Sequence, residues 1–202
     1  IEVVTPGTIT SNKVLDAKKN NYIASLIKGK DSFGYSVIDT STGEFYVGEC
    51  QSDDLYETLS KYNPSEILLP KSISYNIQDW FIKLRPYVTS IEDLHFNYDS
   101  AYRNLVDHFK VNSLKGFGCE HLSNGIIAAG GLYSYLKNNL SKNVNHLRRI
   151  SPVNDIGFMG LDEYTIRNLE IFDSISSHNI NGTLINCIDT TMTSGGGRLL
   201  YK

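Results

Sequence analysis

The sequence lacks the features that most often reveal a metal-binding, redox-active or membrane protein. Its three cysteines, Cys50, Cys119 and Cys187, lie far apart and form no C-x-x-C pair, so neither a zinc site nor a thiol–disulfide redox motif is expected. No apolar run reaches the ~18 residues that a transmembrane helix needs. We therefore expect free, buried thiols, a cytoplasmic location and no membrane contact.

Positive charge is also scarce. Lys and Arg number 19 against 22 Asp and Glu, which gives a formal net charge of -3. The broad basic surface of a stand-alone nucleic-acid-binding protein is therefore not expected. The two short basic pairs, Lys18-Lys19 and Arg148-Arg149, are expected to be ordinary solvated surface.

Phosphate-loop and metal-ligand patterns are missing as well. The pattern G-x-x-x-x-G-K-[ST] does not occur, and the Gly195–Gly197 run is followed by Arg198 rather than by Lys and a hydroxyl residue. The five histidines have no metal-ligand spacing, and none is paired locally with a Ser or Cys nucleophile. The sequence thus predicts no catalytic residue, no cofactor-binding residue and no metal ligand.

Both ends of the sequence read like the interior of a longer chain. Ile1–Val4 begins a strand without an initiator Met or a targeting segment. Residues 193–202 describe the cap and first turns of an amphipathic helix, which is too short to be stable alone because helix nucleation is costly. We expect the chain to be an internal part of a larger protein.

What the sequence does contain begins with three β-like runs. They cover residues 21–27, 33–39 and 44–50 and are rich in Tyr, Phe, Val and Ile, which suit a pleated, half-buried surface. The links between them are short, and each contains a glycine, which is typical of hairpins. An antiparallel meander of three strands is predicted.

Helical and strand patterns then alternate. The expected elements are a helix capped by Ser52, a strand at 67–69, a helix at 77–84, a strand at 88–91 and a helix from a cap at Asp99 or Ser100 to Phe109. This β-β-β-α-β-α-β-α order predicts an α/β fold, a mixed sheet with helices on its faces, in the order that an RNase H-like fold uses.

The remaining sequence is mainly helical. The longest predicted helix covers His121–Asn139, and its small residues Ala128–Gly131 predict close packing against a neighbouring backbone. Polar residues around 138–155 predict a domain boundary, with residues 1–150 and 151–202 as separate domains. The second domain is expected to contain a strand at 156–159, a helix capped by Asp162, a short helix at 184–188 and the helix that starts near Thr193.

An RNase H-like fold raises the question of nuclease chemistry. Nucleases of this fold hold two metal ions between carboxylates, one of them on the first strand. Here the first strand, 21–27, contains no Asp or Glu. Asp39 ends the second strand, and the carboxylates of Asp53, Asp54 and Glu57 are explained by the dipole of the following helix. A metal-dependent nuclease of RNase H type is kept only as the alternative function.

Short motifs in a fixed order resemble the MutS family of DNA mismatch-repair proteins. They are Val3–Thr8, Asn20–Ile23, Asp39 with Ser41–Phe45, Asn63–Leu68, Phe109–Gly118, Ala128–Leu132 with Tyr135–Lys137, His146–Arg148, Leu161–Asp162 with Arg167–Ile171, Gly182–Leu184 and Ile188–Thr193. Each motif is weak alone, but their joint order over nearly the whole chain is specific. The family usually has Pro-Met where Ser194-Gly195 stand here.

The resemblance implies a role for each part of the chain. Residues 1–150 would be the connector domain, which in the family has an RNase H-like fold without nuclease activity, and residues 151–202 would begin the all-α core (lever) domain. Together they would couple the binding of mismatched duplex DNA to the ATPase domain of a homodimeric parent protein in the bacterial cytoplasm. ATP and Mg would belong to the parent, and this part would be neither an enzyme nor a cofactor-binding module.

The resemblance also implies a docking surface for MutL on the helix that matches Asp99–Phe109. Asn104 and His108 stand four residues apart there, and we expect them on an exposed face opposite Leu105 and Val106. They match positions at which relatives use Gln. Two alternatives stay open: this pair is an ordinary solvated face, or the chain comes from a MutS relative that serves recombination rather than repair.

Overall fold

The computed structural model describes residues 5–6, 18, 20–73, 84, 86–139, 144–154, 159–177 and 179–201. Clustering of contacts divides the chain into two compact units, residues 1–10 with 21–153 and residues 11–20 with 154–202. The first unit therefore includes residues 151–153, just past the position at which the sequence suggested a boundary.

A six-stranded mixed sheet forms the centre of the first unit, in the order β5-β4-β1-β2-β3-β6. The strands are β1 (Tyr22–Lys28), β2 (Phe33–Asp39), β3 (Glu44–Cys50), β4 (Glu66–Pro70), β5 (Tyr87–Ile91) and β6 (Ser151–Pro152). Strands β1, β2 and β3 pair antiparallel, whereas β4 joins β1, β5 joins β4 and β6 joins β3 in parallel. The predicted meander and the predicted mixed α/β sheet are confirmed.

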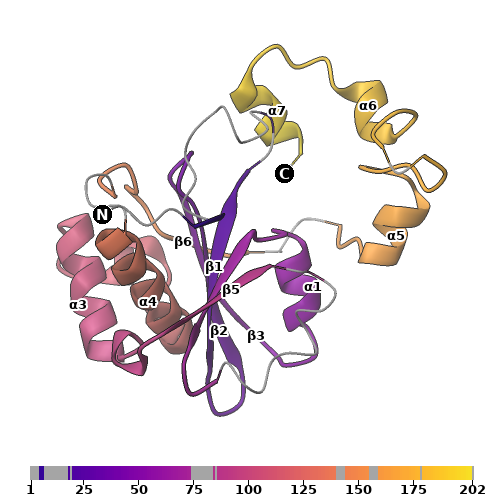
Figure 1. The fold of residues 1–202 in the computed structure, drawn as a ribbon. Helices are drawn as coiled ribbons and strands as arrows, with labels where there is room; N and C mark the ends of the chain where they lie inside the picture. Colours follow the sequence, from indigo (N-terminus) through magenta and orange to yellow (C-terminus); the bar gives the residue numbers. More distant parts are fainter. Residues whose placement is uncertain are drawn as a thin grey trace. The chain divides into compact units, whose positions relative to one another are not determined.

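Helices cover both faces of this sheet (Figure 1). Helices α3 (Tyr98–Phe109) and α4 (Ser123–Asn139) lie together on one face, and the short α1 (Leu55–Ser60) lies on the other. Side chains of β2 and β3 point alternately to the two faces of the sheet and form two apolar clusters. Ile38 and Phe45 pack beneath α3 and α4, whereas Val37 and Tyr35 pack in the cluster that contains Leu55 of α1. The period of two in these strands thus produces two apolar layers.

Helices α3 and α4 approach each other closely because glycine occupies the contact. A Cβ atom added to Gly130 would lie 2.2 Å from the Cβ of Ala101, and one added to Gly131 would lie 2.7 Å from the ring of Phe96. The close packing predicted for Ala128–Gly131 is confirmed. It fixes the position of α3 on the sheet.

Several local predictions were wrong or incomplete. Helix α1 has Asp54, not Ser52, at its N-cap, and α3 is capped by Asn97, whose side chain accepts a hydrogen bond from the backbone N–H of Ser100 at 3.1 Å. Strand β6 was not predicted, because two residues give no periodicity to detect. The helix expected at 77–84, except Leu84, and the strand expected at 156–159, except Met159, lie outside the described residues.

The described part of the second unit contains the short helices α5 (Glu163–Asn168), α6 (Leu184–Ile188) and α7 (Ser194–Leu200). Their N-caps are Asp162, Thr183 and Thr193, and each side chain accepts a hydrogen bond from a backbone N–H of the first turn. The caps explain why the helices start where they do. The predicted helices at 184–188 and after Asp162 are confirmed. No helix among the described residues is long and apolar enough to span a membrane.

Candidate docking face and the carboxylates of the sheet

Carboxylates on the strands of the sheet are the candidate metal ligands of the first unit, and nearby N–H and O–H donors hold them. Asp39, at the end of β2, is fully buried. Its carboxylate accepts hydrogen bonds from the backbone N–H and the hydroxyl of Ser41, at 2.7 and 2.6 Å, and from the backbone N–H of Asn21 at 3.2 Å. These bonds fix the β2–β3 turn and join it to the start of β1, which gives Asp39 a structural role.

Glu66, the first residue of β4, is a buried carboxylate that sequence reasoning assigned no role. Its Oε1 accepts hydrogen bonds from the hydroxyls of Tyr135 and Thr89, at 2.8 and 2.7 Å, and its Oε2 accepts one from the hydroxyl of Thr5 at 2.5 Å. Burial raises the pKa of Tyr135 to about 12, and the hydrogen bond to Glu66 adds to the shift. The network joins Thr5, which precedes the first strand, to β4, β5 and α4.

Glu49 of β3 serves the N-terminus of α4. Its Oε1 accepts hydrogen bonds from the backbone N–H groups of Asn124, at 2.7 Å, and Gly125, at 3.3 Å. A carboxylate at this position satisfies donors that have no partner within the helix and complements the helix dipole. Asp53, Asp54 and Glu57 are exposed on and before α1. Across the described residues, no three His, Cys, Asp or Glu side chains come together as a metal site.

Two of the three thiols, Cys50 and Cys119, lie in surroundings that disfavour a nucleophile. Burial raises the pKa of both Cys50 and Cys119 above the ordinary value for a thiol. A raised pKa keeps a thiol in its protonated and unreactive form near neutral pH. Cys119 therefore acts as a small buried core residue, and half-buried Cys50 packs against the other core cluster. Cys187 is exposed, so the expectation of a buried thiol was wrong at that position.

Helix α3 presents one face to the core and one to solvent. The side chains of Ala101 and Leu105, both in α3, are buried in the core, and exposed side chains recur along the opposite face of the helix. The exposed residues are Asp99, Ser100, Arg103, Asp107 and Lys110. This outer face, defined by these five residues, is the candidate docking face of the first unit.

The structure places Asn104 and His108 at the margin of this face. Both side chains are half-buried, so the expectation that they stand fully exposed was wrong. The His108 Nε2 lies 2.7 Å from the backbone carbonyl oxygen of Leu147, and the ring packs 4.7 Å, centroid to centroid, from the ring of Tyr133. The error arose because the tertiary partners of His108 come from α4 and from the chain after it. The docking role of the pair stays a prediction.

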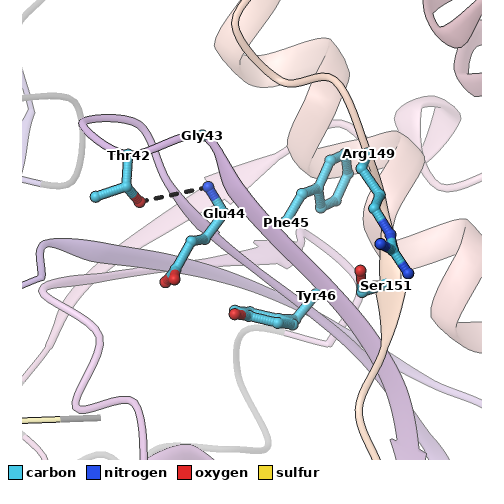
Figure 2. Close-up of a pocket in the computed structure, with 7 residues that line it drawn as sticks. All are labelled: Thr42, Gly43, Glu44, Phe45, Tyr46, Arg149 and Ser151. Carbon is cyan, nitrogen blue, oxygen red and sulfur yellow. Dashed lines mark hydrogen bonds between the residues drawn. The ribbon is translucent and has the colours of Figure 1, made fainter. Parts of the chain in front are cut away.

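A shallow hollow lies beside the paired residues Tyr46 of β3 and Ser151 of β6 (Figure 2). It encloses about 220 Å³ and is lined by Thr42, Gly43, Glu44, Phe45, Tyr46, Arg149 and Ser151. Figure 2 shows the carboxylate of Glu44 and the guanidinium of Arg149 on opposite sides of the Tyr46 ring. Glu44 is engaged, because its Oε2 accepts a hydrogen bond from the hydroxyl of Tyr22 at 2.8 Å.

Comparison with known proteins relates the chain to one family. Residues 21–148 match the family model described as MutS domain II. The chain is 37% identical over 213 residues to the DNA mismatch repair protein MutS of Halothermothrix orenii, and 36% identical over 200 residues to that of Dehalococcoides mccartyi. These alignments cover 100% and 99% of this chain and 23% of each relative, so the chain spans about a quarter of the length of the relatives it matches.

Proposed function

The chain belongs to the MutS family of DNA mismatch-repair proteins, and from that premise we propose that it is a non-catalytic connecting module. In this proposal residues 1–150 form the connector domain and residues 151–202 begin the helical core domain. The module transmits conformational change between the mismatch-binding and ATPase regions of a longer protein and offers a docking surface to MutL. ATP, Mg, mismatched DNA and the dimer contacts belong to those other regions.

One observation supports the proposal above all: the sheet has RNase H-like order, and its buried carboxylates serve the fold. Asp39 holds a turn, Glu66 holds three hydroxyls, and β1 carries no acidic side chain. A two-metal nuclease needs carboxylates that converge on the ions. In this sheet the carboxylates are instead occupied by N–H and O–H donors, as suits a domain that moves and binds rather than cleaves.

The docking proposal rests on the outer face of α3. That helix packs closely against α4 through Ala101 and Gly130, and both helices pack on the sheet. A displacement of α3 by a bound partner would therefore also displace α4 or the sheet. Its exposed residues alternate in sign, with Asp99 and Asp107 beside Arg103 and Lys110. A face of this kind suits a polar, transient interface. Asn104 contributes to its margin, whereas His108 positions the chain at Leu147.

Binding of the 202-residue chain to MutL of the same organism tests the proposal by biolayer interferometry. The double charge reversal Arg103→Glu/Asp107→Lys keeps the net charge of α3 and should weaken binding at least about ten-fold, since mispaired charges at an interface cost several kcal/mol. The control Lys28→Gln/Lys30→Gln removes two charges from the exposed β1–β2 hairpin and should leave binding unchanged. Equal binding by all three proteins would contradict docking on α3.

Two activity assays test the non-catalytic part. The chain should show no ATP turnover above blank, and it should bind mismatched duplex no better than matched duplex. The alternative function predicts Mg²⁺- or Mn²⁺-dependent cleavage of a labelled RNA–DNA hybrid. Cleavage that survives repurification and is lost in Asp39→Asn would establish the nuclease and overturn the connecting role.

A further inference from the structure

The segment before β6 concentrates positive charge in an otherwise acidic chain. His146, Arg148 and Arg149 are all exposed. Within the part of the chain that the structure describes, none of these three side chains makes an ion pair or a side-chain hydrogen bond. The sequence alone suggested ordinary solvated surface for Arg148-Arg149. The structure agrees that both side chains are exposed, and among the described residues neither guanidinium group has a carboxylate partner.

This basic segment, residues 146–149, is fixed to the fold at several points. Leu147 and Ile150 are buried in the core beneath α3 and α4. The backbone carbonyl oxygen of Leu147 is held by the His108 ring at 2.7 Å. Gly43, with a φ of 80°, lets the β2–β3 turn pass close by: an added Cβ would lie 2.9 Å from the carbonyl oxygen of His146. The basic side chains thus project from a backbone whose course is set in advance.

Arg149 lines the same hollow as two hydroxyl residues. These are Thr42 and Ser151, and Figure 2 shows the Arg149 and Ser151 side chains at the same end of the hollow. The nearest acidic group lining that hollow, Glu44, stands beyond the Tyr46 ring and accepts a hydrogen bond from Tyr22. Guanidinium and hydroxyl donors together suit an oxyanion, and Arg presents paired N–H groups that match phosphate oxygens.

We propose that the basic segment 146–149, with Ser151, binds phosphate groups of a DNA backbone. Duplex DNA presents one negative charge per ~1.7 Å of its axis, so two neighbouring arginines can each reach a phosphate. The contact is independent of base sequence and of mismatches, because backbone contacts carry no direct sequence information. It gives the module its own weak hold on DNA, separate from any mismatch-reading region, and goes beyond the proposed docking of MutL.

The salt dependence of binding supplies the test. Fluorescence anisotropy measures the affinity of the 202-residue chain for a short matched duplex between about 50 and 150 mM salt, where each neutralised phosphate contributes a slope of about -0.9 to the log–log plot. In Arg148→Gln/Arg149→Gln the slope should become shallower by about 1.8. Over this threefold rise in salt concentration, the affinity of the wild-type chain should therefore fall by roughly seven-fold more than that of the variant. A mismatch in the duplex should change nothing.

The control variant Lys28→Gln/Lys30→Gln removes the same charge from the far hairpin and should keep the wild-type slope. An equal loss in both variants would mean a general charge effect and would overturn the site. Competition by polyglutamate as strong as by unlabelled duplex would assign the segment to an acidic polypeptide instead of DNA. Absence of any salt-dependent binding by the wild-type chain would also overturn the inference. Binding to MutL, measured separately, distinguishes this failure from failure of the docking proposal.

Discussion

The buried carboxylate of Glu66 offers the sharpest test of how the first unit is held together. Its two oxygens accept three hydroxyl hydrogen bonds, from Tyr135, Thr89 and Thr5, and the residue is 0% exposed. The partners lie 69, 23 and 61 positions away in the chain. Replacement by leucine removes all three acceptor contacts at once and leaves the hydroxyls facing an apolar side chain.

The magnitude follows from two opposing effects. Hydrogen bonds to a charged group contribute about 1.5–3 kcal/mol each, so three of them contribute roughly 4.5–9 kcal/mol. Burial of the carboxylate costs several kcal/mol, and that cost disappears in the variant. We therefore expect Glu66→Leu to lower the free energy of unfolding by about 2–3 kcal/mol, measured by urea denaturation.

A milder variant separates the two oxygens. Glu66→Gln keeps one acceptor oxygen for Tyr135 and Thr89 and places an N–H₂ group towards Thr5, so a loss of only about 1 kcal/mol is expected. Thr5→Val removes the hydroxyl that donates to Glu66 Oε2 and that also accepts a hydrogen bond from the hydroxyl of Tyr135 at 3.3 Å. The two losses share the Glu66–Thr5 contact, so the double variant should cost less than the sum of the two single variants. Additive losses would refute the assigned geometry. A Glu66→Leu variant as stable as the wild type would show that the cost of burying the carboxylate cancels its hydrogen bonds.

Further substitutions, two of them with a control variant, probe the remaining contacts. Glu49→Ala should lower the free energy of unfolding by about 1–2 kcal/mol because the first N–H groups of α4 lose their acceptor, while Glu57→Ala, at an exposed position of α1, should change it little. Gly130→Ala should destabilise by about 1–3 kcal/mol through its clash with Ala101, whereas Gly195→Ala, where the added Cβ meets nothing within 4 Å, should be neutral or stabilising in thermal unfolding. Tyr135 keeps its proton in the folded state up to a pKa of about 12, whereas the unfolded residue loses it near pH 10.0, so stability should fall as pH rises from 10.0 to about 12. Tyr135→Phe should lessen that fall in urea denaturation at several pH values, and an unchanged pH profile would remove the contribution assigned to Tyr135.

The sequence predicted the features that depend on local periodicity. Alternating apolar residues in 33–39 and 44–50 predicted the strands, since neighbouring side chains must point to opposite faces of a sheet. Gly and Ala in the middle of the longest helix predicted its tight packing, because a small side chain there has no other advantage. The missing carboxylate in β1 was also visible, as it concerns a residue type at a defined position.

Features that depend on distant partners could not be predicted in the same way. Glu49 lies in a predicted strand, but no local pattern shows that its carboxylate binds the N-terminus of a helix that begins 74 residues later, at Ser123. The helical pattern placed His108 on an exposed face, but in the fold its Nε2 lies 2.7 Å from the backbone carbonyl oxygen of Leu147. In both cases the sequence defines the donor or acceptor, whereas only the fold decides which group it meets.

Local sequence patterns also could not show that Arg148 and Arg149 lie on a backbone fixed by the core. In a sequence, a pair of neighbouring basic residues is most economically explained as solvated surface. What distinguishes a binding group from a solvated one is the absence of a countercharge together with a rigid backbone, and both are properties of the folded chain. Buried Leu147 and Ile150 supply the rigidity, and the engagement of Glu44 by Tyr22 leaves Arg149 without the carboxylate that shares its hollow. The charge on 148–149 is therefore available to a ligand from outside the chain, which is the physical basis for testing it with DNA.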